Sequence, residues 1–178
     1  NVVAFFTNRN KDLTIMHCVG EYPTETTNLQ LNQISLLKER YPDVKIGYST
    51  HENPADPNIV PLAVAMGALA FEKHVAVVTD EYPKNAYSAT PQHVANWLAH
   101  ARLAFHICGD TTGRPPASEK ELSDLRRFKR GVFVNRDIQK GEEISRTDVF
   151  YAFPCQDGQV LANDMSKYSK YTAEKDLV

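Results

Sequence analysis

The 178-residue sequence has only three cysteines, and they form no recognisable motif. Cys18, Cys108 and Cys155 are far apart and lack the CxxC spacing of a structural zinc site. Their odd number also argues against a disulfide framework and is typical of free thiols in a reducing compartment. We therefore expect a cytoplasmic protein that depends on a packed core.

Long apolar runs and an excess of positive charge are also missing. No apolar segment approaches the roughly 20 residues that a membrane-spanning helix needs, so no membrane partner is expected. The formal net charge is −2. The one basic cluster lies in a polar stretch that we interpret as a solvated linker: Arg126, Arg127, Lys129 and Arg130. Because no basic stripe could neutralise a phosphate backbone, nucleic-acid binding is not expected either.

The sequence does contain an alternation of β-rich and helical segments. In chain order, the predicted elements are a strand at 13–18, a helix at 28–41, a strand at 44–49, a helix at 58–67, a strand at 69–74 and a helix from Thr90-Pro91 to Gly109. The strands start about 25 to 31 residues apart. Repeated units of this kind predict an α/β fold with a parallel sheet, which could belong to a barrel or to an open doubly wound sheet.

The composition changes after residue 108. Residues 109–130 read as a linker with a short helix that begins at Ser118, because Ser118 and Glu121 have the spacing of a capping box. Residues 131–178 contain short β-rich runs separated by turn signals, which predicts a small β-domain. At the other end, NVVAFFTNRNKD resembles the tail of a helix, so we expect the chain to begin within a longer protein.

Polar side chains follow two of the predicted strands. Ser49 and His51 close one strand, and Glu72 and His74 close the next. Side chains alternate along a strand, so the members of each pair point the same way, and parallel strands bring their carboxyl ends together. Two imidazoles suit a divalent transition metal, with Glu72 as an acid, a base or an orienting group. Each histidine could instead be an ordinary hydrogen-bonded surface residue.

Other polar residues near the strands receive different predictions. Lys73 has the opposite parity to Glu72 and His74, so we expect it behind the strand against a helix. His17 has the opposite parity to Cys18 and is expected to pack under a helix. Tyr22, just after the first strand, could line the mouth of the site or be an ordinary loop aromatic. The remaining histidines are expected to face solvent or an interface along the last helix: His93, His100 and His106.

Four segments together resemble the sialic acid synthase family, which includes N-acetylneuraminate synthases and related spore-coat polysaccharide synthesis proteins. In chain order they are HCVGEYPT, IGYSTHE, GALAFEKHV and SATPQHVANWL. The later stretch VFVNRDIQKGEEISRTDV resembles the start of the antifreeze-like (SAF, β-clip) domain of that family. The resemblance covers nearly the whole chain.

The resemblance implies the fold and the chemistry. Residues 1–108 would be the C-terminal part of a (β/α)8 TIM barrel, with its last three strands and helices, and 131–178 would be part of the antifreeze-like domain. The implied reaction condenses phosphoenolpyruvate with an N-acyl amino sugar such as N-acetylmannosamine, giving a 2-keto sugar acid and phosphate. A divalent metal, typically Mn²⁺, is implied, as is a homodimer. The fragment alone is expected to be inactive.

The same resemblance assigns roles to individual residues. His51 and His74 match the two metal-binding histidines, and Glu72 matches the glutamate beside the metal. Tyr22 and Ser49 match substrate- or phosphate-contacting positions.

The sequence departs from the family at four positions. Lys84 or Asn85 stands where an aspartate usually helps to hold the sugar, and we place Asn85 in that substrate-binding role. Thr50, Gly20 and Phe153 replace the usual aspartate, asparagine and sugar-contacting arginine. These changes leave the acceptor sugar open.

Two other functions compete with this interpretation. The altered sugar-contacting positions also fit a non-catalytic relic or scaffold of a carbohydrate pathway. The metal-ligand pattern fits another metal-dependent barrel enzyme as well, such as an aldolase or an isomerase.

Overall fold

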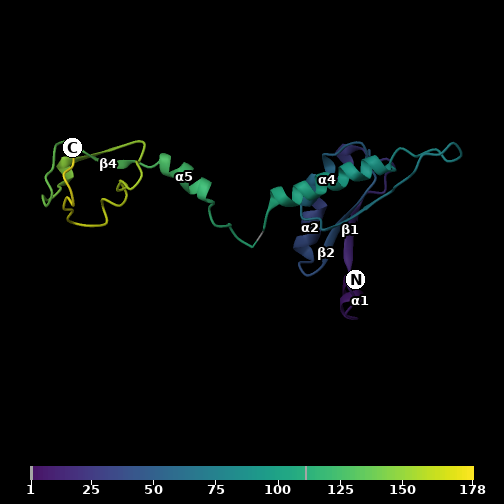
Figure 1. The fold of residues 1–178 in the computed structure, drawn as a ribbon. Coiled ribbons are helices and arrows are strands. Elements are labelled where there is room, and N and C mark those ends of the chain that lie inside the picture. The colour runs from purple at the N-terminus through teal and green to yellow at the C-terminus, as the bar shows by residue number, and fades with distance from the viewer. Residues whose placement is uncertain (1, 111) are drawn as a thin grey trace. The chain divides into compact units, whose positions relative to one another are not determined.

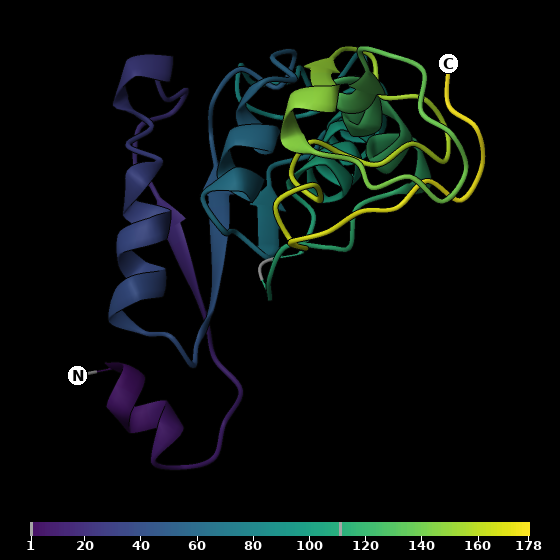
Figure 2. The same ribbon diagram turned by 90° about the vertical axis from the view of Figure 1, so that its left-hand side faces the viewer.

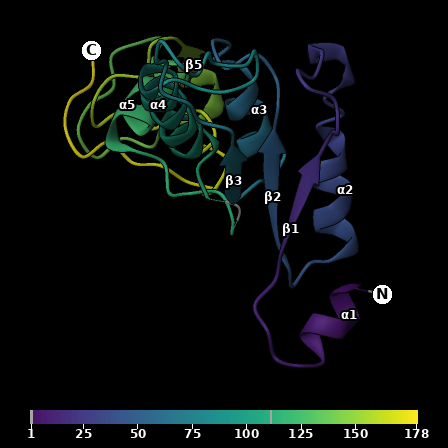
Figure 3. The ribbon, with the colours of Figure 1, turned by 90° about the vertical axis from the view of Figure 1, so that its right-hand side faces the viewer.

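Three parallel strands form the sheet of the first of two units, residues 1–111 and 112–178, into which the chain divides. The structure is a computed structural model that describes residues 2–110 and 112–178. The strands lie in the order β1 (Thr14–Cys18), β2 (Lys45–Thr50) and β3 (Ala70–Lys73) and point in one direction (Figure 3). The predicted parallel α/β arrangement is confirmed.

Three helices cover one face of this sheet: α2 (Asn32–Arg40), α3 (Ile59–Ala65) and α4 (Pro91–Cys108). Tyr48 of β2 is buried in a core with Ile34 of α2 and Ala63 of α3. Phe71 of β3 lies level with Tyr48 and packs edge-on against Trp97 of α4, with ring centres 5.3 Å apart. Side chains alternate along each strand, so those of Ser49 and Glu72, one residue further along, point away from the helices.

The ends of α4 follow its sequence signals. The Thr90 hydroxyl accepts a hydrogen bond from the backbone amide of His93, and the His93 ring accepts one in return from the amide of Thr90. Gly109 ends the helix with φ 65°, a conformation in which a side chain would be strained. Both predicted ends of this helix are confirmed.

The predicted helix at 28–41 begins later in the structure. Residues Thr26–Asn28 form a short 3-10 turn (η1), and α2 starts at Asn32. Gln30 lies between them with φ 50°, which is incompatible with a continuous right-handed helix. Ile34 is fully buried, and Leu31 and Leu37 pack beside it.

Two segments of the first unit project from its core. α1 (Val2–Thr7) has no buried residue and lies beyond the amino end of β1 (Figure 2). The loop 74–89 extends away from the sheet and returns to it (Figure 1), where Ala89 pairs with Val75. Among the described residues, no helix is both long enough and apolar enough to cross a bilayer.

The second unit contains one helix and one strand pair. α5 (Glu119–Arg127) begins at the Ser118 cap, as predicted. β4 (Gly131–Val134) pairs antiparallel with β5 (Val149–Ala152), and η2 (Arg146–Asp148) leads into β5. The unit buries Ile138, Cys155, Met165 and Ala173. In the basic cluster, Arg126 is half-buried and donates to the Gln156 carbonyl, whereas its three basic neighbours are exposed.

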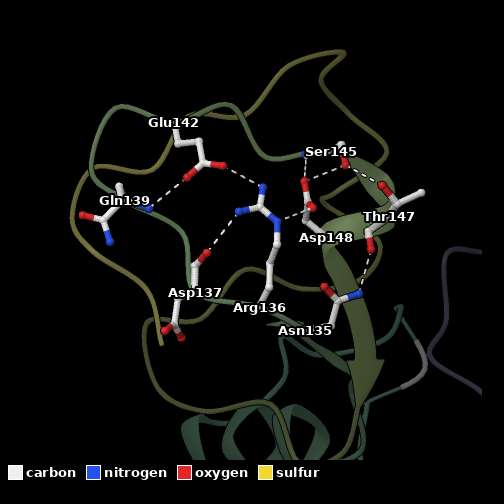
Figure 4. A network of polar contacts seen from close by, with 8 residues as sticks. All are labelled: Asn135, Arg136, Asp137, Gln139, Glu142, Ser145, Thr147 and Asp148. Atoms are coloured by element: carbon white, nitrogen blue, oxygen red, sulfur yellow. Dashed lines mark hydrogen bonds and ion pairs between the residues drawn. The ribbon is translucent and has the colours of Figure 1, made fainter.

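Arg136 holds the loop between β4 and β5 in place (Figure 4). Its guanidinium contacts Asp148 and Glu142, each at 2.7 Å, and donates to the Asp137 carbonyl. Asp148 also accepts hydrogen bonds from the Ser145 hydroxyl and amide. The hydrogen bond from Arg136, and then those from Ser145, hold the pKa of Asp148 well below its usual value. The pKa of Glu142 is lowered by Arg136 and by the amide of Gln139.

Candidate active site

The register of β2 and β3 brings the predicted site residues together. Ser49 lies opposite Glu72, and the Ser49 hydroxyl donates a 2.7 Å hydrogen bond to Glu72 Oε1. Continuing the same register by two residues brings His51 level with His74. The pairing of parallel strands therefore places all four residues at the same edge of the sheet.

The two histidine rings lie side by side. Their centres are 5.2 Å apart, and their planes are tilted by 48°. His51 is buried, and its Nδ1 lies 3.0 Å from the Val19 carbonyl oxygen. A carbonyl can only accept, so Nδ1 carries the proton and the lone pair is on Nε2. His51 is thereby in the tautomer that coordinates a metal through Nε2.

This donor set fits two neighbouring ligands of one divalent cation. Metal–nitrogen bonds of about 2.1 Å at roughly tetrahedral angles place two imidazole centres about 5 Å apart, close to the observed separation. Among the described residues, no group of three or more His, Cys, Asp and Glu side chains could hold a metal. The described residues therefore supply two candidate ligands, His51 and His74.

Two tyrosines complete a cluster of four rings. The Tyr22 ring centre lies 4.2 Å from that of His51 and 6.3 Å from that of His74. Tyr87, from the loop 74–89, is 5.1 Å from His74 and 5.3 Å from Tyr22. The reading of Tyr22 as a residue at the mouth of the site agrees with this position. Tyr87 was not anticipated, because only the return of the loop to the sheet brings it close.

An ion pair lies on the helix side of the same strand ends. Lys73 Nζ is 3.1 Å from Glu52 Oε1, and both side chains are buried. The Tyr48 hydroxyl donates to the other Glu52 oxygen at 3.4 Å. Burial, and then the charge of Glu52, raise the pKa of Tyr48, so the phenol stays protonated. Lys73 is behind the strand, as its parity predicts, but its partner Glu52 was not foreseen.

The other predicted residues are more scattered. Asn85 is exposed, and among the described residues its one hydrogen bond is made by its backbone carbonyl, which accepts from Lys84 Nζ. His17 is buried on the helix side, where its Nε2 lies 2.8 Å from the Leu29 carbonyl oxygen. His93 caps α4, while His106 is exposed. The structure thus gathers Tyr22, Ser49, His51, Glu72 and His74 and leaves Asn85 on the surface of the loop.

Comparison with known proteins identifies one matching family and several similar structures. The model of the NeuB family matches residues 1–112. A Chromobacterium violaceum structure described as a spore coat polysaccharide biosynthesis protein E is 47% identical, with a TM-score of 0.86, and the match covers 99% of this chain and 52% of that one. An N-acetylneuraminic acid synthetase from Leptospira borgpetersenii is 32% identical, with a TM-score of 0.60, over 70% of this chain and 43% of that one.

A curated relative is a sugar-acid synthase. The pseudaminic acid synthase of Campylobacter jejuni is 31% identical over 146 residues, which are 82% of this chain and 41% of the relative. The chain spans about two fifths of the length of the curated relatives that it matches.

Proposed function

This chain belongs to the NeuB family, and on that premise we propose that it is the C-terminal portion of a sialic acid synthase-like transferase. The transferase condenses phosphoenolpyruvate with an N-acyl amino sugar in the biosynthesis of a surface polysaccharide. A carbon–carbon bond forms between the enol carbon and the sugar aldehyde, water adds at C2, and phosphate leaves. The products are a 2-keto sugar acid and inorganic phosphate.

One observation carries the proposal: His51 and His74 lie together beside the Ser49–Glu72 hydrogen bond. Both imidazoles suit Mn²⁺ or a similar divalent cation, and His51 is already in the tautomer that exposes Nε2. When bound there, the cation would supply Lewis-acid polarisation of the sugar aldehyde. A scaffold without chemistry has no need for this combination of donors.

Other residues of the chain serve proton transfer and substrate binding. The Ser49 hydroxyl engages one oxygen of Glu72, which orients the carboxylate and leaves the other oxygen free to take a proton from water. Tyr22 and Tyr87 form aromatic walls against which a sugar ring can pack. We also propose a substrate contact for Asn85, which requires the loop 74–89 to bring it to the sugar.

The larger architecture belongs to the same proposal. We propose that the first unit is part of a (β/α)8 barrel, that the second is part of an antifreeze-like domain, and that the full-length protein is a cytoplasmic homodimer. The 178 residues alone are expected to be inactive, since the phosphoenolpyruvate-binding lysines and glutamate implied by the resemblance would lie on earlier strands.

The test is an assay of the full-length protein with phosphoenolpyruvate, Mn²⁺ and a panel of N-acyl hexoses. Phosphate release with one sugar, together with a product heavier by a pyruvyl unit, would establish both the reaction and the acceptor. An aldolase or an isomerase would release no phosphate. Absence of Mn²⁺ binding, and of any effect of a histidine substitution, would support a relic instead.

The matched variants are His51→Ala and His106→Ala. Loss of a metal ligand removes a contribution of several kcal/mol, so His51→Ala should lower kcat by about a hundredfold or more. His106 is exposed on α4, and its replacement should leave the rate unchanged. Equal rates for the two variants would contradict a metal site at His51.

A further inference from the structure

The two histidines lie just beyond the regular part of the sheet. The last paired residues of β2 and β3 are Thr50 and Lys73, and each histidine is the next residue along its strand. The ladder therefore brings His51 level with His74 but ends one residue before them, so it does not hold their side chains. The carbonyl of His51 accepts from Thr24, and that of His74 accepts from Ala89, so each backbone is tied to a different loop.

The histidine rings are also supported unequally. His51 is buried and bonded to the Val19 carbonyl, whereas His74 is exposed. Among the described residues, the His74 ring forms contacts with other rings but no hydrogen bond. A cation that needs both rings at a set separation thus requires some other constraint on β3.

The buried ion pair supplies a link at this point. Lys73 immediately precedes His74, and Glu52 immediately follows His51. Their side chains meet at 3.1 Å with exposed fractions of 5% and 2%, and the Tyr48 hydroxyl holds the second oxygen of Glu52. The bond therefore joins the two strands across the residues that flank the histidines.

Stability alone does not account for this pair. Removing two charges from water is costly, and apolar residues of similar size often stabilise a protein equally well. A buried ion pair is better suited to fixing one geometry, because its donors and acceptors can be satisfied in one arrangement only.

We propose that the Lys73–Glu52 ion pair is a positioning element that holds His74 and His51 at the separation that a divalent cation requires. The inference rests on the proposed function, because it takes the two histidines as the metal ligands. It concerns cation affinity and not the chemical step. Partners that orient metal ligands typically contribute about tenfold to a hundredfold in affinity.

The decisive variant is the double substitution Glu52→Met/Lys73→Met in the full-length protein. It removes both buried charges together, so neither is left without a partner, and the fold is expected to keep its melting temperature. Mn²⁺ affinity, measured by electron paramagnetic resonance of the free ion, should fall by about tenfold to a hundredfold. An exposed pair on α5 provides the control, Lys120→Met/Asp124→Met, which should bind Mn²⁺ as the wild type does.

A second variant tests the same role if the double variant does not fold. Glu52→Gln keeps the size of the side chain and an oxygen that accepts from Lys73, but it removes the charge that draws Lys73 to it. Its Mn²⁺ affinity should fall while the far-UV circular dichroism spectrum is unchanged. Wild-type affinity in either folded variant would overturn the positioning role.

The two proposals can fail separately. If the wild type binds Mn²⁺ and the double variant binds it weakly, but no sugar gives a product, the positioning role stands and the proposed reaction falls. If the product forms and the double variant binds Mn²⁺ normally, the reaction stands and the positioning role falls. A wild type that does not bind Mn²⁺ overturns both the metal site and the positioning role.

Discussion

At the scale of single residues, the Ser49–Glu72 hydrogen bond is the most informative contact of the site. Ser49 is buried and Glu72 is exposed, so a protected donor orients a carboxylate that solvent and substrate can reach. A carboxylate with one oxygen engaged and one oxygen free has a defined direction for accepting a proton. The contact joins β2 to β3 and therefore depends on their register.

Ser49→Ala in the full-length protein should separate this orienting role from metal binding. The hydroxyl is lost and Glu72 becomes free to rotate, so kcat should fall by about tenfold to a hundredfold, within the range of general acid–base effects. Mn²⁺ affinity should stay at the wild-type level, because Ser49 is not among the proposed ligands. Steady-state phosphate release and Mn²⁺ titration provide the two measurements.

The control for that variant is Ser123→Ala, the same change at an exposed position of α5. It should leave both quantities unchanged. A Ser49→Ala enzyme with wild-type kcat would show that Glu72 needs no orientation by its neighbour.

Alternation along strands was enough to predict that Ser49, His51, Glu72 and His74 share one edge of the sheet. It was also enough to place Lys73 on the opposite side. Tyr87 could not be predicted in the same way, since it lies in a loop, where no period relates side-chain direction to sequence. Glu52 has the same parity as Tyr48, but alternation alone does not show that its carboxylate meets Lys73. The Asn85 assignment came from the resemblance alone and stays a prediction.

At the scale of elements, local signals specified the helix ends that carry a side-chain cap. Ser118 and Thr90 cap their helices as expected, because capping depends on neighbouring residues only. In α3, Ala63 is buried against the sheet but Ala65 is exposed. Two residues along a helix are turned by about 200°, so they cannot both face the sheet.

Thr90→Ala should destabilise the first turn of α4. The hydroxyl that accepts from the His93 amide is removed, at a cost of about 1 kcal/mol, whereas Thr90→Ser should retain the cap. Hydrogen exchange of the α4 amides in the full-length protein measures the change. Similar protection in the alanine and serine variants would argue that the bond from the Thr90 amide to the His93 ring is sufficient.

The Arg136 network makes the second unit sensitive to acid. Asp148 has a pKa well below its usual value of 3.8 in the folded state, so its stabilising effect is complete above that value. The effect is lost as the pH falls toward and through the lowered folded-state pKa. The pKa of Glu142 is also lowered, from its usual value of 4.5, so this residue contributes in the same direction. Protection of the loop amides should therefore be constant down to about pH 5 and should decline below it.

Asp148→Asn tests that dependence. The asparagine side chain cannot ionise. Protection of the Ser145 amide from hydrogen exchange should therefore be weaker than in the wild type at neutral pH and nearly independent of pH. Hydrogen exchange corrected for the intrinsic rate measures it, with Asp124→Asn in the exposed pair on α5 as the control. A wild-type profile in Asp148→Asn would mean that Arg136 acts through Glu142.

At the scale of the whole molecule, the helices among the described residues of the first unit pack on one face of its sheet. Within the described residues, β1 and β3 each pair with β2 alone, so both outer edges carry unpaired backbone groups. Four apolar side chains of α4 are exposed as well: Leu98, Leu103, Phe105 and Ile107. Open edges beside exposed apolar surface favour association with other chains.

The 178-residue chain, expressed by itself, should therefore self-associate and bind the dye ANS. Size-exclusion chromatography with light scattering should give masses above the 20.0 kDa of one chain, and ANS fluorescence should exceed that of the full-length protein. The double substitution Leu103→Lys/Ile107→Lys places charge on the exposed face of α4 and should lower both signals, because two exposed apolar side chains are lost. A monomer without ANS binding would contradict this expectation, since the open edges would then have to be covered by contacts within the chain itself.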